Sequence, residues 1–163
     1  LANDLKITSK TVSKYISILE QAFVVKILYN YSANQLTSEK KLKRIYLSSS
    51  SFCPAVSGSI YDFQKTGLLV ENALLALKSW QFFWRDPYNH EVDFVEIKNK
   101  QVLPVEVKYK TKIRNSDLNN LFLFCKKFHL PKAVILINTI ENQTIEFKGL
   151  TIEMKPVFSA MTD

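Results

Sequence analysis

EVDFVEIKNKQVLPVEVKYK, at residues 91–110, is the stretch that decides the fold of this chain. Its pattern predicts a hairpin of two strands joined by a tight turn. Side chains two positions apart in a strand point to the same face. Glu106 and Lys108 therefore lie side by side, and the hairpin brings Asp93 next to them.

The acid in the first strand of this hairpin needs an explanation. We expect Val92 and Phe94 on one face of the strand, which leaves Asp93 on the other face with Val95 and Ile97. A carboxylate in an apolar stripe is unfavourable unless it has a partner. One interpretation is an edge strand in which Glu and Lys form a weak pair in water. The other is a site that binds a divalent metal and cleaves phosphodiesters.

Phosphodiester hydrolysis needs an activated water and neutralisation of charge on the phosphate, and Mg²⁺ held by one or two carboxylates supplies both. Asp93 and Glu106 are the expected ligands of Mg²⁺ or Mn²⁺, together with the carbonyl of Val107. Lys108 is expected to orient or deprotonate the water, or to stabilise the pentacovalent phosphate. Glu71 is a third acid for this cluster, as a direct ligand or through water. The alternative for Glu71 is stabilisation by the dipole of its own helix.

The segments around the hairpin predict an α/β domain with a mixed sheet flanked by helices. The order from residue 67 is α-β-β-β-α-β, because a helix follows the hairpin and a short loop then leads into a buried strand. The predicted elements are a helix at 67–80, a strand at 81–86, the hairpin, a helix capped by Ser116 or Asp117 that ends near His129, a strand at 132–138 and an edge strand at 150–154.

Residues 1–48 predict a truncated winged helix-turn-helix. A helix capped by Ser9 runs to about residue 22, and a hairpin of strands at 23–31 and 42–48 forms the wing. In this type of domain the start of the second helix meets DNA, whereas a plain helical hairpin is the alternative. The residues expected to contact DNA are Ser9, Lys10, Thr11, Ser13 and Lys14.

The run of serines after this unit predicts a loop and sets the domain boundaries. We therefore expect a partial winged helix at 1–48, a linker at 49–66 and a nuclease-like domain at 67–163.

The formal net charge of +7 is concentrated in the N-terminal part, which has 9 Lys and Arg against 4 Asp and Glu in residues 1–65. This balance fits contact with nucleic acid, and a solvated Lys-rich surface fits it equally well. A basic string next to the proposed metal site is a second candidate for phosphate contacts, or is a solvated face. It consists of Lys108, Lys110, Lys112 and Arg114.

Several further properties follow from composition. No apolar run reaches the roughly 18 residues of a membrane span, and 2 cysteines are too few for a disulfide framework. We therefore predict a cytoplasmic protein with no membrane partner. The chain opens inside a helical motif without an initiator Met, which predicts a piece of a larger protein. A homo-oligomer is left open.

The order Glu71, then Asp93 in EVDFV, then Glu106-Val107-Lys108 resembles the PD-(D/E)XK nuclease-like core. More closely, GLLVEN, FFWRD, EVDFV and PVEVKYK together are similar to the C-terminal region of a prokaryotic AAA+ ATPase family of uncharacterised function. In that family an ATPase module precedes a winged helix and a nuclease-like domain. TSKTVSKYISILEQAFVV and KLKRIYL are similar to its winged-helix part and the strand that follows. The resemblance covers nearly all of residues 1–138.

This resemblance implies a restriction-endonuclease-like fold and an ATPase module in the same full-length chain. ATP would bind only that upstream module, because this sequence contains no Walker motif. Relatives usually have an Asp after the Ile-Tyr-Leu strand, where this chain has YLSSSSF, so the role of that Asp is absent or moved.

Three functional hypotheses remain open at this point. The first is a Mg²⁺-dependent DNA endonuclease-like domain. The second is a catalytically idle module that binds DNA or protein and regulates the attached ATPase. The third is a structural dimerisation domain.

Overall fold

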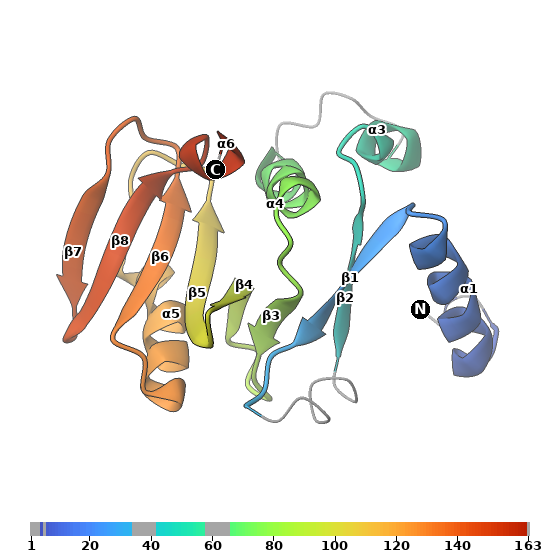
Figure 1. Ribbon diagram of the computed structural model, residues 1–163, viewed down its shortest axis with the longest axis horizontal. Coiled ribbons are helices and arrows are strands. Elements are labelled where there is room, and N and C mark those ends of the chain that lie inside the picture. Colours follow the sequence, from blue (N-terminus) through green and yellow to red (C-terminus); the bar gives the residue numbers. More distant parts are fainter. Residues whose placement is uncertain (1–3, 5, 34–41, 58–65, 163) are drawn as a thin grey trace.

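The computed structural model describes residues 4, 6–33, 42–57 and 66–162. Within these residues, eight strands form a single sheet in the order β2-β1-β3-β4-β5-β6-β8-β7 (Figure 1). The strands are β1 (Val25–Asn30), β2 (Lys43–Leu47), β3 (Phe82–Arg85), β4 (Glu91–Lys98), β5 (Gln101–Lys108), β6 (Lys132–Ile137), β7 (Gln143–Phe147) and β8 (Leu150–Pro156). The helices are α1 (Ser9–Gln21), α3 (Phe52–Ser57), α4 (Thr66–Leu77), α5 (Asn115–Phe128) and α6 (Ser159–Thr162).

The sheet is mixed, as the sequence predicts. β3, β4 and β5 form an antiparallel meander, while β5, β6 and β8 run parallel to one another. The expected order α-β-β-β-α-β is confirmed by α4, β3, β4, β5, α5 and β6. A parallel pair requires a crossover connection, and α5 provides it between β5 and β6.

Helices cover both faces of the sheet and divide the core in two. On one face α5 buries Leu121 and Phe124 against strand residues such as Ile135. On the other face α4 buries Leu74 and Leu75 in a second cluster, and α6 packs beside α4 at the end of β8. The helices are placed this way because each presents an apolar stripe that must be removed from water.

The N-terminal hairpin belongs to the same sheet. β1 and β2 pair antiparallel as predicted, but β1 also pairs in parallel with β3. The Tyr29 amide donates to the Gln81 carbonyl at 2.9 Å, and the Asn30 side chain bonds the Arg85 backbone in both directions. The hairpin is therefore not set apart from the rest of the fold, as a separate wing would be.

Helix α1 is confirmed, with a different cap. Thr8, rather than Ser9, is the N-cap, and its hydroxyl accepts a hydrogen bond from the Thr11 amide. The short helix that a helix-turn-helix would have before this turn falls on residues 1–3 and 5, which lie outside the described part of the chain. None of the α1 residues is buried, and its contacts are with β1.

Three other predicted features are wrong. Part of the serine-rich loop is helical, since α3 begins at Phe52. The N-cap of α5 is Arg114. Asp117 is the third residue of the helix, and its carboxylate accepts a hydrogen bond from the Arg114 amide. The strand expected at the edge near the C-terminus, β8, is internal, because β7 pairs outside it.

In the part of the chain that the structure describes, no helix has both the length and the apolar character needed to cross a membrane.

Candidate active site

The candidate site lies where β4 and β5 separate. Their pairing begins at the turn and ends at Phe94 opposite Val105. Beyond that point the β5 residues pair with β6, and the β4 residues pair with β3. The Asp93 carboxylate occupies the opening, where its Oδ2 accepts a hydrogen bond from the Val107 amide at 2.9 Å. A side chain thus replaces a ladder hydrogen bond between the strands.

A bulge in β4 explains how an acid fits into this buried strand. Phe82 pairs with Val95 and Trp84 pairs with Val92, so three steps on β4 oppose two on β3. Val92 and Val95 consequently pack in the same cluster under α5, whereas Phe94 packs in the cluster under α4. The expectation that Val92 and Phe94 share a face is wrong, because the bulge interrupts the alternation.

Glu106 and Lys108 lie side by side on β5, as predicted. Val105 and Val107 pack in the α4 cluster, so the alternation of the strand directs both charged residues to the other face. Lys108 Nζ donates to Glu106 Oε1 at 2.5 Å. Glu106 is only 3% exposed, and its second oxygen, Oε2, is buried without a hydrogen-bond partner. The edge-strand interpretation is therefore wrong, since β5 is central in the sheet and Glu106 is buried.

Glu71 reaches the site from α4, on the other side of the opening. Its Oε2 accepts a hydrogen bond from the Tyr46 hydroxyl at 3.5 Å. Burial raises the pKa of Glu71 most, the Asp93 charge raises it further, and the Arg44 and Lys108 charges lower it. The structure thus brings Glu71, Asp93 and Lys108 within electrostatic reach of one another, and Asp93 and Lys108 also act on Glu106.

The site strongly favours protonated carboxyl groups when no cation is added. Burial, and then the Asp93 charge, raise the pKa of Glu106 to about 8 and that of Glu71 to about 7. Burial also raises the pKa of Asp93, despite its bond from the Val107 amide. Burial lowers the pKa of Lys108, but the Glu106 charge outweighs it and the net pKa is raised. The lysine therefore remains an ammonium at neutral pH.

Two residues on β2, Arg44 and Tyr46, also belong to this site, although no sequence motif indicates them. Arg44 pairs with Glu91 and lies 3.8 Å from Asp93, and its guanidinium also donates to the Tyr46 hydroxyl at 3.2 Å. The two side chains share a strand face because they are two residues apart. The alternation of Arg and Tyr in KRIYL indicates that these two side chains share a face. It does not indicate that they face the acids, which depends on the pairing of β1 with β3.

The donor atoms fit a hard divalent cation, although they are not preassembled around one. Among the described residues, no group of three or more His, Cys, Asp or Glu side chains could hold a metal ion. Mg²⁺ commonly uses only one or two carboxylates and retains several waters. The unpartnered Oε2 of Glu106 and the nearby carboxylate of Asp93 meet that requirement. Val107 contributes its amide to Asp93.

The predicted DNA-contacting residues fall into two groups. On α1, four of the five are exposed and Thr11 is half-buried and bonded to Thr8. In the loop before α5, Lys112 and Arg114 are exposed, but Lys110 pairs with Asp117 at 2.6 Å. Lys110 is therefore occupied in stabilising the start of α5 and is a weaker candidate for a phosphate contact. The four exposed α1 residues are Ser9, Lys10, Ser13 and Lys14.

Comparison with known proteins places this arrangement in a family. Neither the curated proteins nor the solved structures gave a match to the chain. Residues 1–60 match the family described as Domain of unknown function (DUF8612). Residues 68–155, which contain all four predicted catalytic residues, match the family described as Domain of unknown function (DUF4143). Because this match covers more than half of the sequence, the chain belongs to the DUF4143 family.

Proposed function

We propose that this chain is a Mg²⁺-dependent DNA endonuclease-like domain of a prokaryotic AAA+ ATPase, with a PD-(D/E)XK type of core. The observation that carries the proposal is the buried group at the opening between β4 and β5. There a carboxylate oxygen of Glu106 has no partner, Asp93 lies nearby, and the Lys108 ammonium is held against Glu106. Burial of ionisable groups is unfavourable unless they are paired or coordinate a cation.

The residues of the site divide the work as follows. Asp93 and Glu106 would hold Mg²⁺ or Mn²⁺, which when bound supplies an activated water and neutralises phosphate charge. The Val107 amide fixes the Asp93 carboxylate at the opening of the strands. Lys108 is a cation beside these acids, so it is placed to stabilise negative charge on the phosphoryl group. Glu71 would bind the cation directly or through a water.

The proposal includes two partners, an ATPase module in the same full-length chain and DNA. The family is often found in AAA-ATPase-associated proteins, which supports an ATPase module in the full-length chain as the ATP-binding partner. α1 would place the DNA beside the edge of the sheet that the β1–β2 hairpin forms. The exposed Lys10 and Lys14 on α1 support contact with the phosphate backbone.

Cleavage of supercoiled plasmid in Mg²⁺ or Mn²⁺ tests the proposal. We expect nicking by the wild-type chain, and a loss of about 10²–10³-fold in rate for Asp93→Ala and for Lys108→Ala, since the first removes a metal ligand and the second removes a cation that stabilises charge on the reacting phosphate. Glu141→Ala removes an exposed acid outside the site and serves as the matched control. Cleavage that persists in both site variants would contradict the catalytic assignment.

The same assay separates chemistry from DNA placement. Lys10→Glu combined with Lys14→Glu is expected to weaken DNA binding and reduce its dependence on salt, because fewer counterions are released. Cleavage at saturating DNA should then be unchanged. An unaltered salt dependence would remove α1 from the DNA-binding surface.

A second function is favoured by the position of Arg44. Its guanidinium already supplies positive charge to Asp93 and Glu91. In this alternative the acids are satisfied by Arg44 rather than by a metal, and the domain binds DNA or protein without cleaving it. Absence of metal-dependent cleavage by the wild-type chain, with DNA binding retained, would favour this function.

A further inference from the structure

A groove on the α4 and α6 side of the sheet is separate from the acidic site. It has a volume of about 570 Å³ and lies between the C-terminal end of α4, the face of the sheet and α6. None of the four candidate catalytic residues lines it. We call it the lysine groove, because Lys78, Lys98 and Lys155 all line it. Its size is within the range of small-molecule sites.

The charge of the lysine groove favours an anion. Within the described part of the chain, neither Lys78 nor Lys98 has an ion-pair partner. Lys155 pairs with Glu153 at 2.7 Å and is the third cation of the lining. Glu96 is the one acid among the groove-lining residues, so the described lining carries a net positive charge. Lysines in such a cluster are suited to a phosphate group.

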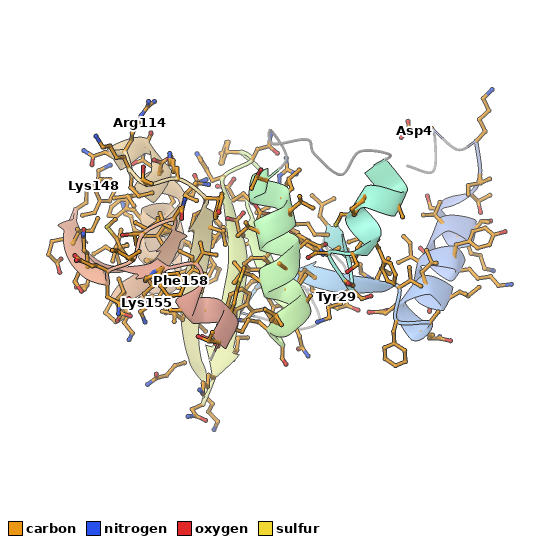
Figure 2. All side chains as sticks on the ribbon, turned by 90° about the horizontal axis from the view of Figure 1, so that it is seen from above. Asp4, Tyr29, Arg114, Lys148, Lys155 and Phe158 are labelled. Atoms are coloured by element: carbon orange, nitrogen blue, oxygen red, sulfur yellow. The ribbon has the colours of Figure 1, made fainter. Side chains whose placement is uncertain are left out.

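The floor of the groove is apolar and suits a flat ring. It consists of sheet residues that belong to the core under α4 or pack against it: Leu103, Val105, Val134 and Leu136. Figure 2 shows Lys155 and Phe158 together near α6, on a different side of the molecule from Arg114 and Lys148. The groove thus combines an apolar floor with a basic rim.

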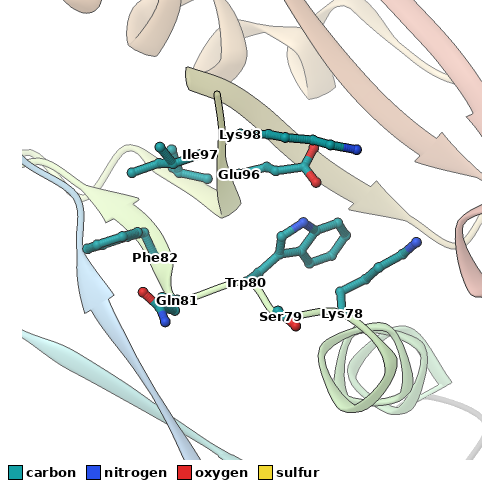
Figure 3. A pocket seen from close by; sticks show the side chains of 9 residues that line it. Lys78, Ser79, Trp80, Gln81, Phe82, Glu96, Ile97 and Lys98 are labelled. Atoms are coloured by element: carbon teal, nitrogen blue, oxygen red, sulfur yellow. The ribbon is translucent and has the colours of Figure 1, made fainter. Parts of the chain in front are cut away.

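Trp80 adds a second and independent observation. Its ring packs on Phe94 with 4.6 Å between the centroids, and its Nε1 is buried without a hydrogen-bond partner. A buried indole N–H usually has an acceptor. Figure 3 shows Trp80 between Lys78 and the pair Glu96 and Lys98, in an adjoining hollow of about 230 Å³ that shares these residues with the groove.

From these features we propose that the lysine groove binds a nucleoside monophosphate or a ligand of the same chemistry, with a flat ring on the apolar floor and a phosphate among the lysines. The Trp80 N–H donates to a ring nitrogen or a sugar oxygen. Glu96 accepts a hydrogen bond from an amino or hydroxyl group of the ligand. This binding does not require the acidic site to be active.

Calorimetric titration of the metal-free chain with AMP, adenosine and inorganic phosphate tests this inference. We expect AMP to bind at least tenfold more tightly than either fragment, because only AMP fills both the floor and the rim. Lys78→Ala combined with Lys98→Ala should weaken AMP binding by tenfold or more. Lys126→Ala, which removes an exposed lysine of α5, is the matched control and should have no effect.

Other outcomes would overturn the inference. AMP that binds no more tightly than phosphate would exclude the ring site, and equal loss in the Lys126→Ala control would show non-specific charge attraction. Trp80→Phe keeps an aromatic ring but removes the N–H, so unchanged AMP affinity in a folded Trp80→Phe variant would exclude the proposed hydrogen bond. Because the lysine variants leave Asp93 and Glu106 intact, plasmid cleavage by these variants distinguishes failure here from failure of the proposed endonuclease.

Discussion

Glu106→Gln is expected to increase the free energy of unfolding of the metal-free protein by about 2–5 kcal/mol at pH 9, and to remove metal-dependent cleavage. The reason is that burial and the Asp93 charge raise the pKa of Glu106 to about 8, even though Lys108 opposes the shift. The ionised carboxylate is therefore less stable in the folded chain than in the unfolded chain. Glutamine keeps an oxygen for the Lys108 ammonium but removes the buried charge.

The pH dependence has a defined sign. The unfolded chain loses the Glu106 proton near pH 4.5, whereas the folded chain retains it up to about pH 8. The folded state binds more protons across that interval, so this stabilising contribution is fully present below pH 4.5 and is lost as pH rises through 8. Glu71 acts in the same direction up to about pH 7.

Urea unfolding in the presence of a chelator, at a series of pH values from 5 to about 9, measures this effect. The wild-type chain should lose stability along the series, and Glu106→Gln should reduce that loss. Glu141→Gln is a suitable control, because Glu141 is exposed. A parallel decline in wild type and Glu106→Gln would show that Glu106 does not carry a buried charge at high pH.

Arg44→Ala is expected to increase the affinity of the site for Mn²⁺ by about tenfold, which corresponds to about 1.4 kcal/mol. Arg44 lies 3.8 Å from Asp93 and pairs with Glu91, so its charge competes with an added cation. Its removal frees the acids for the metal, as opposite charges at this separation interact strongly near a protein surface. Binding is measured by calorimetry at about pH 9, where the carboxyl groups are more fully ionised.

Arg44→Lys retains the charge and is the control for loss of the side chain. Its Mn²⁺ affinity should stay near that of the wild type. If Arg44→Ala binds Mn²⁺ no better than the wild type, Arg44 does not compete with a cation. In that case the position of Arg44 would no longer favour the idle module over the endonuclease.

The β4–β5 hairpin and the pair Glu106 and Lys108 could be predicted from the sequence, because strand alternation is a local property. The surrounding order of helices and strands was predictable for the same reason, from apolar periodicity and breakers. Glu71 was identified by the chemistry expected of a third acid and by resemblance. The orientation of Asp93 was not predictable, because a bulge shifts the register by one residue and no residue of EVDFV marks it.

Contacts between distant segments could not be predicted either. Arg44 and Tyr46 reach the acids because β1 pairs with β3 and carries β2 to the edge of the same sheet. The sequence interpretation of that hairpin as a wing hid this contact. The position of β8 inside the sheet could not be predicted for the same reason. β7 pairs with its outer side, and the local sequence does not indicate this pairing.

Binding of a divalent cation between β4 and β5 is the central requirement of the proposed endonuclease. Crystals of the wild-type chain soaked in Mn²⁺ would show its anomalous scattering. We predict a peak at about 2.0–2.2 Å from carboxylate oxygens of both Asp93 and Glu106, with Arg44 displaced from Asp93. If the anomalous map has no peak at that position and Arg44 still lies against Asp93, the metal site and the proposed endonuclease are contradicted.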